Sequence, residues 1–144
     1  MPRWFDHIDL RVRRLSEVRR FYETLLPALG FTRDAKIDGW LQYEVESNGG
    51  VSEFFGVTES PQHVANESRI AFWAESVEEV NRLAIVAVRA GARNVEGPMY
   101  NVEGPMYDNG NYYAVFLKTR AAIAWKFVTE KIDERGIVVM KGNI

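Results

Sequence analysis

The chain contains no cysteine among its 144 residues, and this absence excludes several kinds of site at once. Without a thiol there is no disulfide bond, no thiolate ligand for a metal ion and no cysteine nucleophile. Proteins of reducing compartments lack disulfides, so we expect a cytoplasmic protein. The N-terminal segment also lacks the basic and then apolar pattern of a signal peptide, and we expect none.

The chain is also poor in net charge and in long apolar runs. Its formal net charge of −2 provides no basic footprint for nucleic acid or for an anionic membrane. No apolar run approaches the roughly 18 residues that indicate a membrane-spanning helix. What the chain does have is 47% hydrophobic and 12% aromatic residues, which is enough to form a core. We therefore expect a single folded domain over residues 1–144.

The first half of the chain shows a strand, a helix and further strands in that order. In DHIDLRV, at residues 6–12, polar and apolar side chains alternate, which predicts a half-buried strand. Ser16 then offers a helix cap, apolar residues recur at helical spacing, and Gly30 ends the helix. Two strands follow, around WLQYEVES and VSEFFGVTE, separated by a glycine turn.

The same order of elements returns in the second half. HIDLRVRRLSEVRRF aligns with RIAFWAESVEEVNRL, so that His7 meets Arg69 and Glu17 meets Glu79. We therefore predict two β-α-β-β-β modules, module one over residues 5–60 and module two over residues 67–130. Each module is too small to bury its own apolar face, so the two modules must pack against each other.

This doubled β-α-β-β-β pattern resembles the vicinal oxygen chelate superfamily. The motifs that carry the resemblance are DHIDLRV, the S-E-V-x-x-F-Y helix that ends in LGF, and RIAFWAESVEEV. The superfamily includes glyoxalase I, extradiol dioxygenases, and fosfomycin and bleomycin resistance proteins. The resemblance implies an α+β fold in which each module curls a mixed sheet into a cup with its helix outside. It also implies a cleft between the cups that holds a divalent metal, and a homodimer.

In this superfamily the metal ligands come from the first and last strands of both modules. His7 matches the histidine of the first strand, whereas Arg69 stands where a second histidine is usual. Lys126 stands where the last strand usually carries a glutamate. In the last strand of module one the alignment gives either Glu53 or Phe55. These two residues are two positions apart, so we expect both to face the cleft.

The cationic substitutions argue against a metal site. A divalent cation needs anionic or neutral Lewis bases, and Arg69 and Lys126 are positively charged. We therefore expect no metal cofactor, with His7 and Glu53 as the ligands if a metal does bind. Glu53 is instead expected to pair with Arg69 or Lys126. The remaining positive charge would favour a small molecule that carries a carboxylate or phosphate group.

Several functions remain open at this point. The first is metal-free binding of a small anionic or aromatic molecule, and the second is a non-catalytic remnant whose ion network plugs the site. The third is an enzyme, either a metal-dependent lyase, isomerase or dioxygenase, or one that acts through His7. His7 is the best catalytic candidate, with Asp9 on the same strand face as the residue that orients it. His63 is expected to be a polar surface residue.

The aromatic residues provide a lining for such a ligand. Trp40, Trp73 and Phe55 are expected to project into or beside the cleft, which suits an apolar or planar molecule. Trp125 and Lys126 are neighbours in the last strand, so their side chains point to opposite faces of the sheet. We therefore expect Trp125 in the helix-facing core.

The phrase NVEGPMY occurs twice without a change, at residues 94–100 and 101–107. One copy is enough to form the strand that follows the second helix. We expect that copy to pair in the sheet and the other to form an exposed or partner-contacting loop. The duplication beside the cleft is then a recent or engineered insertion, with an evolved ligand lid as the alternative. The tail, residues 131–144, contains an apolar segment at 137–140 with the composition of a short strand.

Overall fold

The two modules form two four-stranded sheets, each with one helix. A computed structural model describes residues 5–100 and 112–130. Module one contains β1 (His7–Val12), α1 (Leu15–Leu29), β2 (Arg33–Asp34), β3 (Trp40–Ser47) and β4 (Gly50–Glu59). Module two contains β5 (Arg69–Trp73), α2 (Val77–Arg89), β6 (Arg93–Tyr100), β7 (Tyr112–Lys118) and β8 (Ala124–Glu130). The predicted order of elements is confirmed in both modules.

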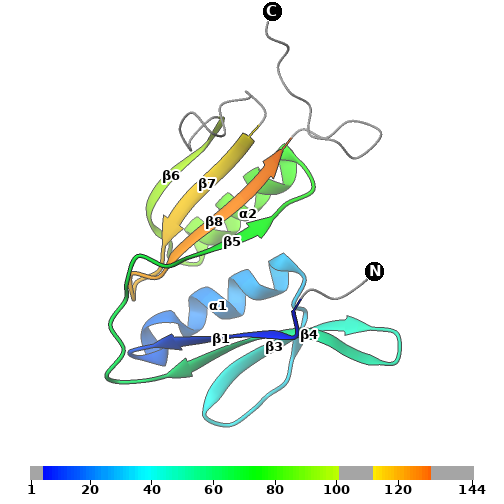
Figure 1. Cartoon of the computed structure of the whole chain (residues 1–144), viewed down its shortest axis with the longest axis vertical. Coiled ribbons are helices and arrows are strands. Elements are labelled where there is room, and N and C mark those ends of the chain that lie inside the picture. Colours follow the sequence, from blue (N-terminus) through cyan, green and yellow to red (C-terminus); the bar gives the residue numbers. More distant parts are fainter. Residues whose placement is uncertain (1–4, 101–111, 131–144) are drawn as a thin grey trace, which may run out of the picture.

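The two sheets have the same topology. Sheet A has the strand order β1-β4-β3-β2, and sheet B has the order β5-β8-β7-β6 (Figure 1). In each sheet the first and last strands of the module run parallel, and the remaining neighbours are antiparallel. The predicted α+β fold of two modules with mixed sheets is therefore confirmed.

The helix ends follow from local sequence in module two and from a long-range contact in module one. In α2, Ser76 caps the helix, because its hydroxyl oxygen accepts a hydrogen bond from the Glu79 backbone N–H at 3.1 Å. The prediction that Ser16 caps α1 is wrong, because that helix already begins at Leu15. The Leu15 N–H donates at 3.0 Å to the carboxylate of Glu59, at the end of β4. Gly30 ends α1 in the left-handed conformation, as expected.

The main hydrophobic core contains side chains of both modules. The ring centroid of Trp125 lies 5.5 Å from that of Phe55 in module one and 5.5 Å from that of Phe72 in module two. The Trp125 indole N–H donates a hydrogen bond of 3.2 Å to the hydroxyl of Tyr22 on α1. Figure 1 shows α1 between the two sheets, where its apolar face contributes to this core. The prediction that the modules pack against each other is confirmed.

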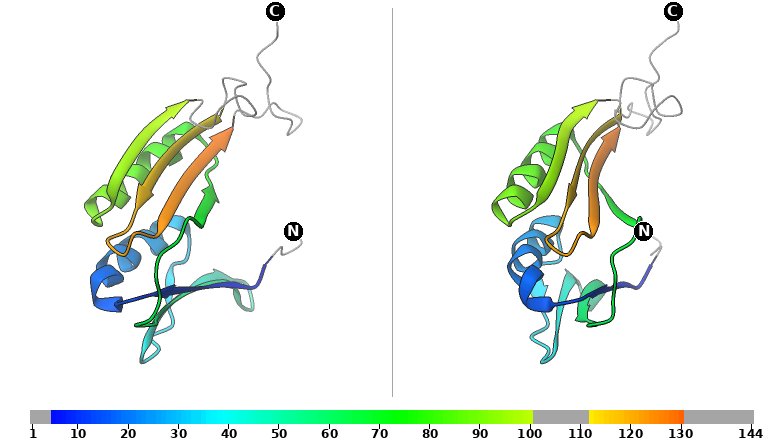
Figure 2. Two further views of the ribbon diagram at one scale, coloured as in Figure 1. Left: turned by 60° about the vertical axis from the view of Figure 1, so that its left-hand side comes forward. Right: turned by 90° about the vertical axis from the view of Figure 1, so that its left-hand side faces the viewer.

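Each sheet is covered by a helix on one face. Figure 2 shows α2 along one face of sheet B, while neither helix of the described residues lies on the opposite face. We call the face of each sheet that points away from its own helix the outer face. Within the described ranges, neither α1 nor α2 has the length and apolarity that crossing a membrane would require.

The first copy of the doubled phrase forms most of β6. Strand β6 pairs with β7 through Glu96 with Phe116 and Met99 with Ala114, and its register shifts on both sides of Glu96. Gly97 has a φ of +92°, and a Cβ there would lie 2.8 Å from the Ala114 carbonyl oxygen. This position therefore requires glycine. The second copy, at 101–107, and the tail, with its predicted strand at 137–140, lie outside the described residues.

Deleting residues 94–100 is expected to leave the fold intact. The two copies are identical, so deletion of either one yields the same chain, and the remaining copy supplies the same β6 residues after Arg93. A change in the length of a connection alters its closure entropy by only a fraction of a kcal/mol. The free energy of unfolding should therefore change by less than about 1 kcal/mol. Urea denaturation followed by circular dichroism measures the change. An unfolded or molten variant would contradict the prediction.

Candidate functional site

The pairing of β1 with β4 decides which side chains of module one share the outer face. His7 lies opposite Phe54, and Asp9 lies opposite Gly56. Because side chains alternate along a strand, these residues face one side of sheet A together. They line a shallow pocket of about 320 Å³ with the exposed ring of Trp40. Trp40 therefore lies beside His7.

Glu53 and Phe55 lie on the opposite face of β4, and their predicted position facing His7 is wrong. Phe55 is fully buried, with its ring 6.2 Å from that of Tyr22 on α1. Glu53 accepts a hydrogen bond from the hydroxyl of Ser52 and takes part in none of the ion pairs of the described residues. The expected pair between Glu53 and Arg69 or Lys126 is therefore also wrong. The sequence alignment could not show which face of β4 these side chains occupy, because that depends on the register between β4 and β1.

The register identifies a different counterpart of Lys126 in module one. Lys126 lies opposite Ala71, two residues after Arg69. The equivalent residue in module one lies opposite Asp9, two residues after His7, and this residue is Gly56. The fourth family position therefore has no side chain at all.

His7 interacts with neighbours other than the predicted one. Its Nδ1 lies 2.8 Å from a carboxylate oxygen of Asp6, and its ring stacks on Phe54 with 4.4 Å between centroids. Asp9, which was expected to orient His7, instead accepts a hydrogen bond of 2.8 Å from Arg11. A hydrogen-bonded His–Asp pair is therefore present on the outer face of sheet A, but Asp6 supplies the carboxylate.

Arg69 and Lys126 converge on one aromatic ring on the outer face of sheet B. The Arg69 guanidinium carbon lies 4.6 Å from the centroid of Phe116, and the Lys126 Nζ lies 5.2 Å from the same centroid. The Lys126 Nζ is also 4.6 Å from the centroid of Tyr112. Lys126 is only 7% exposed, and contact with the negative faces of two rings offsets part of the cost of burying its charge.

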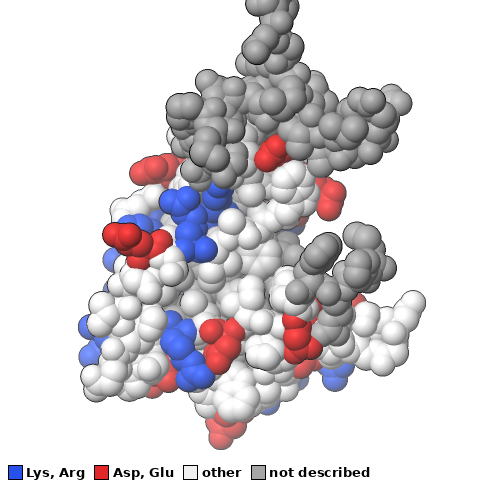
Figure 3. All heavy atoms as spheres, in the orientation of Figure 1, with Lys and Arg blue, Asp and Glu red and all other residues white. Residues whose placement is uncertain are grey.

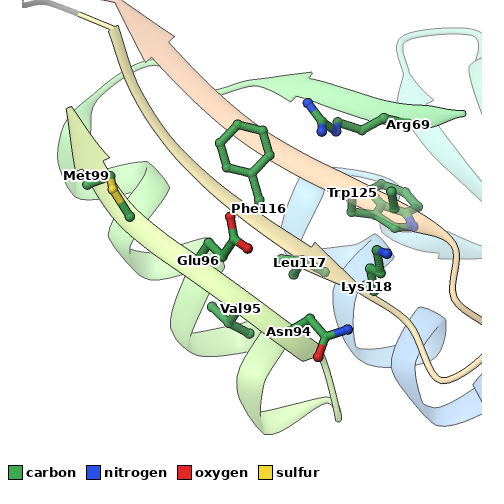
Figure 4. A pocket seen from close by; sticks show the side chains of 10 residues that line it. Arg69, Asn94, Val95, Glu96, Met99, Phe116, Leu117, Lys118 and Trp125 are labelled. Atoms are coloured by element: carbon green, nitrogen blue, oxygen red, sulfur yellow. The ribbon is translucent and has the colours of Figure 1, made fainter. Parts of the chain in front are cut away.

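A pocket of about 720 Å³ opens beside these residues (Figure 4). Arg69 on β5, Phe116 and Lys118 on β7, and Glu96 and Met99 on β6 line it. Figure 4 shows the Glu96 side chain pointing toward Phe116. Figure 3 shows lysine and arginine atoms gathered over sheet B, and the three described cations here outnumber the one carboxylate. Phe116, Lys118 and Glu96 were not predicted, although β7 parity places Phe116 and Lys118 on one face.

Of the remaining predicted residues, only Trp125 is among the described residues that line this pocket. Trp73 is 48% exposed and lines a pocket between the modules, together with Glu53. Trp125 is fully buried on the helix side, as predicted. His63 lies in the linker before β5, where it lines a small surface pocket with Arg13 and Arg120. The structure thus brings Arg69 together with Lys126, but it places His7 on sheet A and Glu53 between the modules.

The side chains at the four family positions do not fit a divalent metal. By register these residues are His7, Gly56, Arg69 and Lys126, and only the histidine is a metal ligand. Within residues 5–100 and 112–130, no three His, Cys, Asp or Glu side chains gather in a way that could hold a metal ion. We therefore derive no chemistry through a metal at these positions.

Comparison with known protein families identifies the chain. A sequence model of the Glyoxalase/Bleomycin resistance protein/Dioxygenase superfamily matches residues 4–127. The chain belongs to this superfamily. The match covers the whole of both modules except the last residues of β8, so the resemblance found in the sequence is confirmed. No curated protein sequence matches the chain.

Solved structures of the superfamily share the fold at low sequence identity. A glyoxalase/bleomycin resistance protein from Albidiferax ferrireducens T118 superposes with a TM-score of 0.67 and 20% identity, covering 90% of this chain and 100% of its own. The fosfomycin resistance protein FosX from Mesorhizobium loti gives 0.60 and 14%, covering 94% and 98%. FosX from Listeria monocytogenes gives 0.58 and 14%, covering 94% and 97%. At these identities the likeness establishes the fold alone.

Proposed function

We propose that this protein binds a small organic anion with a planar or apolar body, without a metal, in the pocket on the outer face of sheet B. The observation that carries the proposal is the convergence of Arg69 and Lys126 on the Phe116 ring, beside a pocket of about 720 Å³. This volume lies in the range that holds small ligands. Phe116 and Met99 provide apolar surface, and Arg69 and Lys118 provide donors for a carboxylate, phosphate or phosphonate.

The cations beside the pocket support an anion over a neutral ligand. Among the described residues, Arg69, Lys118 and Lys126 carry positive charges near the pocket, and Glu96 carries a negative charge. A partly desolvated site concentrates this potential more than an open surface does. The planar guanidinium of Arg69 also matches the two oxygens of a carboxylate.

A matched pair of probes tests the proposal. Because the charged group is the main attraction, 2-naphthoate should bind at least about tenfold more tightly than neutral 2-naphthamide. Isothermal titration calorimetry at low and at high salt measures both affinities, and salt should weaken only the naphthoate complex. Fosfomycin serves as a compact phosphonate probe, because FosX is among the similar structures. Equal binding of the two naphthalene probes, or no binding of any anion, would reject the proposal, and the second result would favour a plugged remnant.

Metal content provides an independent check. The purified protein should contain no stoichiometric divalent metal, because His7 is the only ligand at the family positions. Inductively coupled plasma mass spectrometry after dialysis measures the metal-to-protein ratio. A ratio near one for a tightly held divalent ion would instead favour the metal-dependent alternative.

An enzyme acting through His7 is the second candidate. The carboxylate of Asp6 lies 2.8 Å from Nδ1, so a proton held there leaves Nε2 as an acceptor beside the pocket on sheet A. Such a pair can act as a general base. Anion binding in the pocket on sheet B has stronger support than an enzyme that acts through His7. The side chains of His7 and Asp6 are exposed to water, by 45% and 65%.

We also propose a cytoplasmic homodimer. Superfamily members commonly pair modules across a dimer, and within residues 5–100 and 112–130 neither α1 nor α2 covers the outer face of a sheet (Figure 2). Size-exclusion chromatography with light scattering should give twice the chain mass of 16.5 kDa. A monomer at high protein concentration would contradict this part of the proposal.

A further inference from the structure

A further pocket lies between the two modules, beside strand β5. It has a volume of about 380 Å³. Module one contributes Phe5, Ile8, Phe31 and Glu53, and module two contributes Phe72 and Trp73, among other residues. We call it the inter-module pocket. It is separate from the pocket that contains Arg69, and the two share no lining residue.

The lining of this pocket is apolar and aromatic except for one carboxylate. Phe31 is buried, with its ring centroid 5.9 Å from that of Phe72, so these rings join the pocket to the core. Phe5 and Trp73 are 44% and 48% exposed. Large apolar rings that remain this exposed around a concavity are typical of a binding site.

Among the described lining residues Glu53 carries the only charge, and no cation of the described residues pairs with it. The carboxylate accepts one hydrogen bond, from the Ser52 hydroxyl, and none of the described ion pairs includes it. A half-buried carboxylate beside apolar rings attracts a cation more strongly than a carboxylate on an open surface does. The geometry therefore suits a cation from outside the chain.

We propose that the inter-module pocket binds a monovalent organic cation with an apolar or aromatic body, such as an arylalkylammonium ion. Glu53 pairs with the ammonium group, and Trp73 adds attraction through the face of its indole ring. The apolar body packs against the exposed rings of Phe5 and Trp73. This site has the opposite charge preference to the anion pocket, and it does not depend on the proposed function.

The test uses 2-phenylethylammonium and its neutral analogue 2-phenylethanol as probes for isothermal titration calorimetry. Wild-type protein should bind the ammonium ion at least about tenfold more tightly than the alcohol, because only the ion pairs with Glu53. Glu53→Gln keeps the shape of the side chain and removes its charge, so it should abolish this preference and leave alcohol binding unchanged. Glu46→Gln, an exposed carboxamide substitution on the neighbouring strand β3, is the matched control and should change neither affinity.

Three further measurements test the role of Trp73 and the separation of the pockets. Trp73→Leu should weaken the ammonium complex more than the alcohol complex, because leucine retains apolar surface but has no ring face. Arg69→Ala should leave ammonium binding unchanged, and 2-naphthoate and 2-phenylethylammonium should bind at the same time.

The proposal is overturned if wild-type protein does not bind the ammonium ion at millimolar concentration, or if Glu53→Gln binds it as tightly as wild type. Either result overturns it whatever the anion experiments show.

Discussion

Replacement of Trp125 by alanine is expected to lower the free energy of unfolding by about 3–5 kcal/mol. The indole is fully buried, and its ring contacts Tyr22, Phe55 and Phe72, which come from both modules. The substitution therefore leaves a large cavity where the modules meet. It also removes the donor of the hydrogen bond to the Tyr22 hydroxyl, so that a buried polar group loses its partner.

Urea denaturation followed by tryptophan fluorescence and circular dichroism measures this loss. Trp125→Phe keeps an aromatic ring and removes the N–H, so it should cost about 1–2 kcal/mol. Trp40→Ala is the matched control, since this tryptophan is 39% exposed on the outer face of sheet A, and it should change stability by less than about 1 kcal/mol. Equal effects of the two alanine substitutions would show that Trp125 does not join the modules.

Tyr22 provides a second way to observe the same contact. Burial raises the pKa of its phenol above the usual range, and the hydrogen bond from Trp125 offsets part of that effect. The unfolded chain releases this proton near pH 10, while the folded chain retains it. The contribution of Tyr22 to stability is therefore complete below about pH 10 and decreases as the pH rises further, because the unfolded state then binds fewer protons than the folded state. We therefore expect Tyr22 to contribute to a loss of stability above about pH 10.

The fold could be predicted from the sequence because its signals are local and occur twice. Alternation in residues 6–12, helical spacing before Gly30 and the aligned RIAFWA segment each identify an element without knowledge of its neighbours. Parity also placed Trp125 and Lys126 correctly on opposite faces of β8, because that comparison lies within a single strand. The cap of α1 was missed because its acceptor, Glu59, is distant in sequence.

The candidate site was predicted less well because it depends on the register between strands. One-residue differences in register reverse the face of every side chain, and the alignment of β4 allowed Glu53 or Phe55 where the structure has Gly56. The meeting of Arg69 with Phe116 requires the pairing of β5 with β8 and of β8 with β7. No local pattern contains that information. The chemical argument from Arg69 and Lys126 remained useful, because their charge does not depend on register.

Reversal of the charge at Arg69 is expected to have the largest effect on ligand binding. Arg69→Glu removes a charge-assisted hydrogen bond and places a second carboxylate near Glu96, in the pocket that both residues line. Each effect opposes an anion, so the affinity for 2-naphthoate should fall by about 100-fold, which corresponds to about 2.7 kcal/mol. The affinity for neutral 2-naphthamide should change little, because its apolar contacts with Phe116 and Met99 remain.

Arg20→Glu is the matched control for this experiment. It changes the net charge by the same amount, but Arg20 is exposed on α1 and takes part in none of the described ion pairs. A long-range effect of net charge would weaken naphthoate binding equally in both variants and would disappear at high salt. A direct contact predicts a large loss in Arg69→Glu alone, much of it persisting at high salt because the pocket is partly shielded from solvent. Calorimetry of both variants at two salt concentrations therefore decides whether the Arg69 side chain contacts the ligand or acts only through the overall field.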